Sequence, residues 1–157
     1  MFSNELVCNI LEYIEININN SISVDQISNV FGYEKSYIMK KFKKELGITI
    51  INYINSIRIL NSLRGFYEYN SFLDIAINNG FNSLEYYSEI FKKVIKVSPR
   101  SYKKFIKRDN NLTLTEFETI LNSLAALNAL KKKIKKYRTY IKHDTSPILK
   151  LAITRSN

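Results

Sequence analysis

Apolar residues recur at helical spacing along most of the chain, and capping residues mark where the helices begin. Ser23 and Ser71 each precede an apolar segment, and Gln or Asp follows three residues later. At a helix start, a serine hydroxyl can accept a hydrogen bond from an N–H group that has no partner within the helix. We therefore predict helices over 24–31 and 72–79.

A glycine and a second apolar segment follow each of these helices. Gly32 and Gly80 can adopt the positive φ of a sharp turn, and helical spacing resumes over 35–46 and 83–95. The offset between the copies is 48 residues up to the glycine and 49 from Phe42 onwards, so the second copy holds one additional residue. A plain helical bundle would rarely repeat caps, turn and core together. The sequence therefore predicts two helix-turn-helix motifs.

Further segments extend this pattern before, between and after the copies. The spacing predicts helices over 5–18, 50–63 and 99–107. It also predicts an additional helix of about 25 residues that begins at a capping box of Thr115 and Glu118. The helix over 50–63 would be a rod of roughly 22 Å, able to set two reading helices about one DNA turn apart. The predicted fold class is all-α.

The chain is expected to have four parts. They are a first helix-turn-helix subdomain, a connecting helix, a second helix-turn-helix subdomain, and a basic amphipathic C-terminal helix with a tail, over 1–48, 49–65, 66–108 and 109–157. Three roles are open for the C-terminal helix: packing on the domain with a solvated basic end, a homodimer contact, or contact with phosphates or a membrane surface. The homodimer contact would use Leu121, Leu124 and Leu127. We expect 144–157 to be loosely ordered.

Composition narrows the class of function. The net charge is +10, from 24 Lys and Arg against 14 Asp and Glu, and residues 111–157 alone hold 9 against 3. Such an excess favours polyanions as partners, nucleic acid first. One cysteine, Cys8, and one histidine, His143, are too few for a disulfide, a cysteine zinc site or a catalytic triad. We expect no metal and no other cofactor, with Cys8 in the core and His143 exposed.

No segment indicates a membrane protein or an enzyme. The chain has no run of about 20 apolar residues, and its N-terminus lacks the basic region of a signal peptide. A nucleotide-binding glycine loop and a nucleophile with its base are also absent from the sequence. We therefore expect a cytoplasmic protein with no membrane span and no enzymatic activity.

The second helix of each motif has a core face and an outer face. Ile38 and Phe42 are expected in the core of the first motif, and Tyr87 and Phe91 in that of the second. The candidate DNA-binding residues lie on the outer faces or beside them: Ser36, Tyr37, Met39, Lys40, Lys43, Lys44, Ser83, Leu84, Glu85, Ser88, Glu89 and Lys92. Tyr86 is a further candidate for contact with a phosphate through its hydroxyl.

Residues at the turns, caps and cores together form a recognisable signature over about residues 5–107. They are Gly32-Tyr33, 42–47, Tyr53-Ile54, Arg58-Ile59, Ile75-Ala76, 80–83, 91–93, 97–99 and Tyr102. With these residues the chain resembles the AraC/XylS family of bacterial transcription regulators. The resemblance implies two helix-turn-helix modules joined by a long helix, binding as a monomer to an asymmetric DNA site, and contact with RNA polymerase. Most members carry an effector-binding domain before this unit; we expect none here, which makes the chain similar to small standalone members such as MarA and SoxS.

Carried over onto this sequence, the resemblance assigns roles in the first module. The base-reading face falls on Ser36, Met39 and Lys40, with Lys43 and Lys44 nearer the phosphates. A lysine at a base edge favours guanine, and a methionine offers apolar contact, for example to a thymine methyl group.

The second module departs from the family pattern. Glu89 stands where a basic residue is common, with Glu85 one turn before it, and Lys96 stands where the family often has glycine. Carboxylates facing phosphates are repelled unless each finds a donor, such as a cytosine amino group or a neighbouring lysine. Either this module reads cytosines, or it sits weakly on DNA while the first module supplies the affinity.

The predicted function is a sequence-specific, DNA-binding regulator of transcription in the cytoplasm of a bacterium, at the nucleoid. Its predicted partners are double-stranded DNA and RNA polymerase. The alternative is a protein-interaction module on the same helical fold, with weak or no specific DNA binding.

Overall fold

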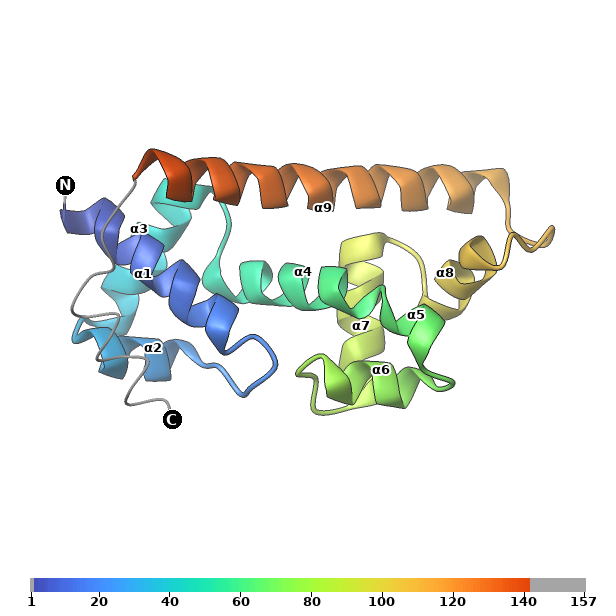
Figure 1. The fold of residues 1–157 in the computed structure, drawn as a ribbon, viewed down its shortest axis with the longest axis horizontal. Helices are drawn as coiled ribbons and strands as arrows, with labels where there is room; N and C mark the ends of the chain where they lie inside the picture. The colour runs from blue at the N-terminus through green and yellow to red at the C-terminus, as the bar shows by residue number, and fades with distance from the viewer. Residues whose placement is uncertain (1, 142–157) are drawn as a thin grey trace. The chain divides into compact units, whose positions relative to one another are not determined.

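The computed structural model describes residues 2–141, and the regular elements in that range are helices. In chain order they are α1 (Phe2–Ile16), α2 (Val24–Phe31), α3 (Lys35–Leu46), α4 (Ile50–Ser62), α5 (Gly65–Glu68), α6 (Phe72–Asn78), α7 (Leu84–Ile95), α8 (Pro99–Ile106) and α9 (Leu114–Tyr140) (Figure 1). The all-α prediction is confirmed. The predictions for His143 and for 144–157 lie outside the described residues.

The described residues form two compact units. Unit 1 holds 2–54 and 132–141, and unit 2 holds 55–131. The boundaries fall inside α4 and α9, so each of these helices contributes residues to both units. The described part of the predicted C-terminal segment therefore does not pack as a separate body.

Unit 1 is built around the apolar faces of its first three helices. Tyr13 of α1 meets Phe31 of α2 edge to face, with ring centroids 5.9 Å apart. Phe42 of α3 packs against Tyr53 of α4 at 5.7 Å. Both pairs are buried, and aromatic contacts of this kind stabilise a core beyond the area that they bury. Cys8, expected in the core, is half-buried, and burial raises the pKa of its thiol.

Unit 2 has an aromatic core. Phe66 of α5 packs against Tyr102 of α8 at 4.8 Å and against Phe91 of α7 at 5.6 Å between ring centroids. The Tyr87 hydroxyl shares a hydrogen bond of 3.0 Å with that of Ser62, which satisfies both groups in the interior. Apolar residues from the first half of α9 complete the same core: Ile120 and Leu127 are buried in it, and Leu124 packs against it.

Most helix ends lie within two residues of their predicted positions. The exception is the start of the first helix, which lies at Phe2 instead of residue 5. The short helix α5 was not anticipated, because four residues carry too little periodicity to be recognised.

The capping box predicted for α9 was wrong. The residues that form it are Thr113 and Glu116: the Thr113 Oγ1 accepts from the Glu116 N–H at 3.1 Å, and Glu116 Oε2 accepts from the Thr113 N–H at 3.0 Å. The sequence offers the same spacing at Thr115 and Glu118. The first pair prevails because Ser101 of α8 also donates a hydrogen bond to Glu116, at 3.1 Å.

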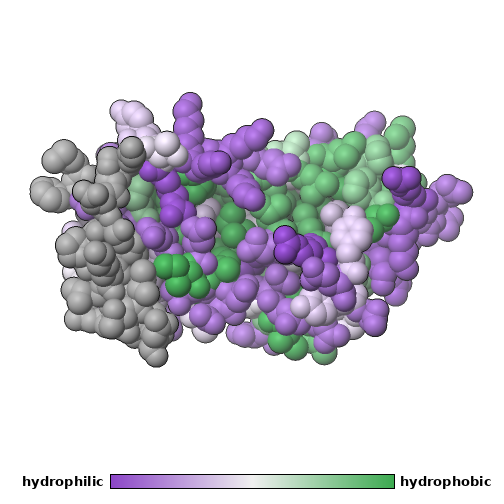
Figure 2. All heavy atoms as spheres, in the orientation of Figure 1, coloured by the Kyte–Doolittle hydropathy of each residue, from purple (hydrophilic) through white to green (hydrophobic). Residues whose placement is uncertain are grey.

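Polar and apolar side chains both lie on the surface of the described residues. Hydrophilic residues dominate the face drawn in Figure 2, with apolar patches between them. Large exposed apolar side chains include Met39 in unit 1 and the α6 pair Leu73 and Ile77 in unit 2. Among residues 2–141, no helix is both long enough and apolar enough to cross a membrane.

Candidate nucleic-acid interface

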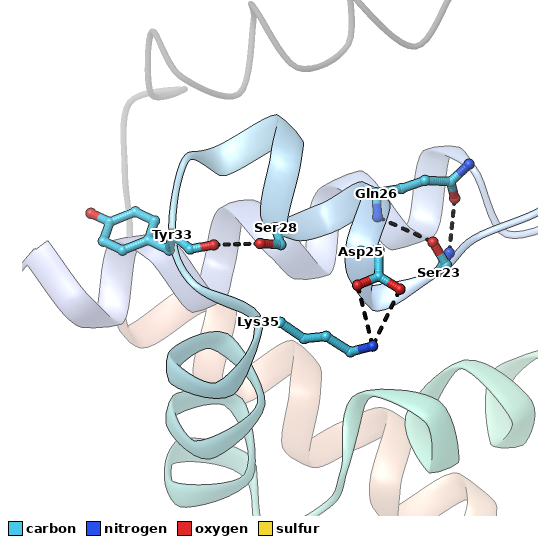
Figure 3. Close-up of polar contacts among 6 residues, drawn as sticks. All are labelled: Ser23, Asp25, Gln26, Ser28, Tyr33 and Lys35. Atoms are coloured by element: carbon cyan, nitrogen blue, oxygen red, sulfur yellow. Dashed lines mark hydrogen bonds and ion pairs between the residues drawn. The ribbon is translucent and has the colours of Figure 1, made fainter.

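The first motif begins at the predicted Ser23 cap, which Gln26 completes as a capping box. The Ser23 Oγ accepts from the Gln26 N–H at 3.1 Å, and the Gln26 side-chain oxygen accepts from the Ser23 N–H at 2.8 Å (Figure 3). This reciprocal pair satisfies two N–H groups at the start of α2. The predicted start of this helix is confirmed.

Polar contacts hold the turn between α2 and α3. Gly32 has a φ of 74°, and its N–H donates to the Ser28 carbonyl at 2.9 Å. The Ser28 hydroxyl donates to the Tyr33 carbonyl at 2.5 Å, and the Lys35 ammonium lies 3.2 Å from the Asp25 carboxylate (Figure 3). The last contact joins the start of α3 to the first turn of α2. These contacts set the direction in which α3 leaves the turn.

The core face and the outer face of α3 are those predicted. Ile38 and Phe42 are fully buried. All six candidate residues on this helix are exposed: Ser36, Tyr37, Met39, Lys40, Lys43 and Lys44. Tyr37 stacks on Tyr33 of the turn, with ring centroids 5.4 Å apart. α3 therefore offers a polar face with one apolar residue, Met39, to a partner.

The charge on α3 is strongly positive. The helix holds five lysines and one glutamate, Glu45, which forms an ion pair of 3.0 Å with the half-buried Lys41. The other lysines of the helix are exposed. An open hollow at the start of α3 is lined by Ser28 of α2 together with Glu34, Lys35, Ser36 and Met39. A positive face of this kind suits a polyanion.

The second motif repeats the first at the predicted offset. The Ser71 hydroxyl accepts from the Asp74 N–H at 3.1 Å, and Gly80 has a φ of 85°. Ser83 caps α7 by accepting from the Tyr86 N–H at 3.1 Å, and it lies 49 residues after Glu34, the N-cap position of α3. The additional residue therefore lies between Gly80 and Ser83.

Some candidate residues on α7 are less available than predicted. Glu85, Glu89 and Lys92 are exposed and Ser88 is half-buried. Leu84 was wrongly placed outside: it is half-buried and packs against the core of unit 2. It lies three residues before Tyr87 and seven before Phe91, so all three side chains are on one face of the helix.

The outer face of α7 is electrically balanced. The helix holds two glutamates and two lysines, and Glu89 forms an ion pair of 3.0 Å with Lys93. The Asn55 side chain, which was not anticipated, donates to the Tyr86 hydroxyl at 3.2 Å and so orients another exposed group of α7. Nothing in the sequence around Asn55 signals this contact, because its partner lies 31 residues away.

Comparisons with known proteins agree with this geometry. A family model described as a helix-turn-helix domain matches residues 27–104, from within α2 to within α8. The chain belongs to the AraC-type helix-turn-helix family. In this family the helix-turn-helix domain is a DNA-binding domain of transcription regulators.

Relatives of this AraC-type chain are regulators. It is 30% identical over 109 residues to the uncharacterized HTH-type transcriptional regulator YbfP of Bacillus subtilis, covering 69% of this chain and 37% of that protein. It is 32% identical over 106 residues to an uncharacterized response regulatory protein of Staphylococcus epidermidis, and this match covers 68% of this chain and 42% of that protein. The chain thus matches less than half the length of these relatives.

Solved structures support the fold. A Listeria innocua protein of unknown function aligns with a TM-score of 0.58 and 26% identity, covering 62% of this chain and 93% of that one. The C-terminal domain of AraT, a response regulator from Geobacillus stearothermophilus, aligns with a TM-score of 0.60 and 24% identity, covering 64% and 84%.

Proposed function

We propose that the chain is a sequence-specific regulator of transcription that inserts α3 and α7 into successive major grooves of double-stranded DNA. The observation that carries this proposal is the construction of α3. Ile38, Phe42 and Leu46 fix one side of the helix in the core of unit 1, and the opposite side exposes a basic, polar face. A helix of this kind fits the width of the major groove.

The exposed residues of α3 have complementary chemistry toward DNA. Lys40 would donate to the N7 and O6 acceptors of a guanine, and Met39 would contact a thymine methyl group. Lys43 and Lys44 would neutralise phosphates, and the Tyr37 hydroxyl would reach another. Ser36, in the first turn, can donate to or accept from a base edge.

For α7 the structure favours weak engagement over the reading of cytosines. The Ser83 hydroxyl already caps the helix, and Leu84 is partly committed to the core. Glu89 is paired with Lys93, which reduces its repulsion from phosphates and also occupies one of the cations of this helix. The balanced charge of α7, set against the excess of lysine on α3, supports the proposal that the first motif supplies most of the affinity.

A regulator of this kind acts in the cytoplasm, at the nucleoid, and contact with RNA polymerase follows from the family resemblance. We retain the four-part division of the chain as the functional one, with both motifs in contact with DNA and the first motif reading the bases. A homodimer through α9 stays a prediction with reduced support. Leu127 is buried in unit 2 and Leu124 packs against its core, which leaves Leu121 as the exposed member of the three.

The alternative, a protein-interaction module, has one observation in its favour. Leu73 and Ile77 are four residues apart on α6 and are 46% and 57% exposed. Two apolar side chains on one helix face can anchor a protein partner. These two residues form a small patch, however, whereas exposed lysines occur along the whole length of α3.

Selection from a pool of duplexes with a randomised centre tests the proposal. The full chain is incubated with the pool, bound duplexes are recovered and sequenced, and affinity is then measured by gel shift across a salt series. We expect one enriched motif and an affinity that falls steeply as salt rises. Recovery of unrelated sequences, or binding that is insensitive to salt, would favour the interaction module.

A further inference from the structure

A side chain from the far end of the chain contacts the last turn of α3. The Lys133 Nζ, on α9, donates a hydrogen bond of 2.8 Å to the carbonyl oxygen of Leu46, 87 residues earlier. Leu46 is the last residue of α3, where carbonyl groups have no partner within the helix. A cation at this end also interacts favourably with the helix dipole. Lys133 therefore supplies what the end of α3 lacks.

The backbone after α3 leaves room for this contact. Gly47 has a φ of 72°, and a Cβ atom built on it would lie 3.3 Å from the Lys133 Nζ. That distance is tighter than an ordinary van der Waals contact, so a larger residue would push the ammonium group away from the carbonyl. The glycine thus permits both the left-handed turn and the approach of the lysine.

Other residues on the same face of α9 hold this part of the helix on unit 1. Ile134 is buried. Tyr137 is also partly buried, and this burial raises the pKa of its hydroxyl; the nearby Glu45 carboxylate raises it further. Arg138 forms an ion pair with Glu15 of α1 and lies 4.0 Å from Glu12. Residues 133, 134, 137 and 138 are spaced as one face of a helix. The ammonium group of Lys133 is therefore presented to α3 by a segment that is anchored on unit 1 by the residues that follow it.

We propose that Lys133 is a positioning residue for the DNA-reading helix α3; this inference rests on the function proposed above for α3. Hydrogen bonds to base edges need donor and acceptor within a few tenths of an ångström of their best distance. A helix whose last turn frays or shifts loses that accuracy along its outer face. The lysines of α9 are all exposed, and Lys133 differs in that its ammonium group donates to the end of α3, while Lys132, Lys135 and Lys136 lie on other sides of the helix.

The test compares Lys133→Met with Lys132→Met in the full chain. Both changes remove one positive charge from adjacent positions, but only the first removes the hydrogen bond to Leu46. Two quantities are measured: hydrogen exchange of the amides in the last turn of α3 without DNA, and the ratio of affinities for the selected duplex and a mixed-sequence duplex at several salt concentrations.

For Lys133→Met we expect about fivefold faster exchange in the last turn of α3 and an affinity ratio lowered about fivefold. The salt dependence should stay as in the unchanged chain, because Lys133 does not contact phosphate. Lys133→Arg, which can still donate to the carbonyl, should restore both quantities. Lys132→Met should leave the exchange and the ratio unchanged. If Lys133→Met unfolds unit 1, Lys133→Gln, whose side chain is shorter and uncharged, is measured in its place with the same expected results.

The outcomes separate this inference from the function on which it rests. Unchanged exchange in α3 overturns the inference, whatever the affinities. A lower ratio with unchanged exchange and a weaker salt dependence also overturns it, because Lys133 would then contact DNA itself. If the unchanged chain prefers no duplex while Lys133→Met still accelerates exchange, the proposed function fails and the support of α3 by Lys133 stands.

Discussion

Lys96 after α7 has the same backbone conformation as Gly47 after α3. Their φ values are 71° and 72°, and each N–H donates to the carbonyl four residues earlier, Lys92 or Lys43. The two positions are 49 residues apart, the offset of the repeat from Phe42 onwards. The geometry of this helix end is therefore shared by both motifs, although only the first has the residue type that adopts it without strain.

Replacing Lys96 by glycine should stabilise the protein. A residue with a Cβ atom pays about 1–2 kcal/mol in the left-handed region, and part of this is offset by the greater freedom of glycine in the unfolded chain. We expect Lys96→Gly to raise the free energy of unfolding by about 0.5–1 kcal/mol, measured by urea denaturation. Lys96→Ala is the control and should show no such gain, because alanine keeps the Cβ atom. Equal stability of the two variants would contradict this explanation.

Two glycines in unit 1 allow a matched comparison. Gly32 and Gly47 both have positive φ, but a Cβ atom at Gly32 meets nothing within 4 Å, whereas one at Gly47 approaches Lys133. Each change to alanine should cost about 1–2 kcal/mol of stability. The cost at Gly47 should be larger by up to about 0.5 kcal/mol, because the Lys133 ammonium must move aside and its hydrogen bond to Leu46 is weakened. In a chain that already carries Lys133→Met, this difference between the two glycines should disappear; its persistence would show another cause.

Lys40 should discriminate between DNA sequences. If it donates to a guanine, Lys40→Ala weakens binding to the selected duplex by about 1–3 kcal/mol. Binding to a mixed-sequence duplex should weaken less. Lys132→Ala, at an exposed position of α9, is the control and should not alter the ratio of the two affinities. Parallel losses on both duplexes after Lys40→Ala would mean that Lys40 contacts phosphate only.

Glu89 should oppose DNA binding rather than read a base. Glu89→Gln removes a carboxylate and releases Lys93 from its ion pair, so affinity should rise by about 0.5–1 kcal/mol with a steeper salt dependence. The selected motif should stay the same. Glu118→Gln, an exposed change of the same kind on α9, serves as the control. A changed preference at one base pair would instead show that Glu89 accepts from a cytosine.

Glu116 makes the stability of unit 2 depend on pH. The backbone N–H of Thr113, together with the hydroxyl of Ser101, holds the pKa of this carboxyl below its ordinary value of 4.5. Because the pKa of this carboxyl is lower in the folded state than in the unfolded state, its ionised form stabilises the fold at pH values above the unfolded pKa. This stabilisation is lost as the pH falls through the pKa of the folded state. Titration by NMR should show the low midpoint, and Glu116→Gln should remove this part of the pH dependence. A midpoint at or above 4.5 would contradict the capping role.

Both helix-turn-helix motifs could be predicted from the sequence because their signals are local. The Ser23 cap, the turn at Gly32 and the spacing of Ile38 and Phe42 all lie within residues 23–42, and the second copy repeats them. The charge of α3 and its exposed face follow from the same spacing.

The features that the sequence did not reveal depend on distant partners. The choice of Thr113 over Thr115 is decided by Ser101 of α8, and the role of Lys133 by a carbonyl 87 residues away. Within a run of lysines, nothing local distinguishes Lys133 from its neighbours. The partial burial of Leu84 could have been predicted, because its spacing from Tyr87 and Phe91 places it on the core face of α7.

Reading of DNA by α3 is tested most directly by repeating the duplex selection with a changed reading face. Met39 is exposed and has only apolar contact to offer, so Met39→Arg adds a guanine-reading side chain without disturbing the core. We expect the selected motif to change toward guanine at one or two adjacent base pairs and to stay the same elsewhere. A motif that is identical for both proteins would contradict the assignment of α3 as the reading helix.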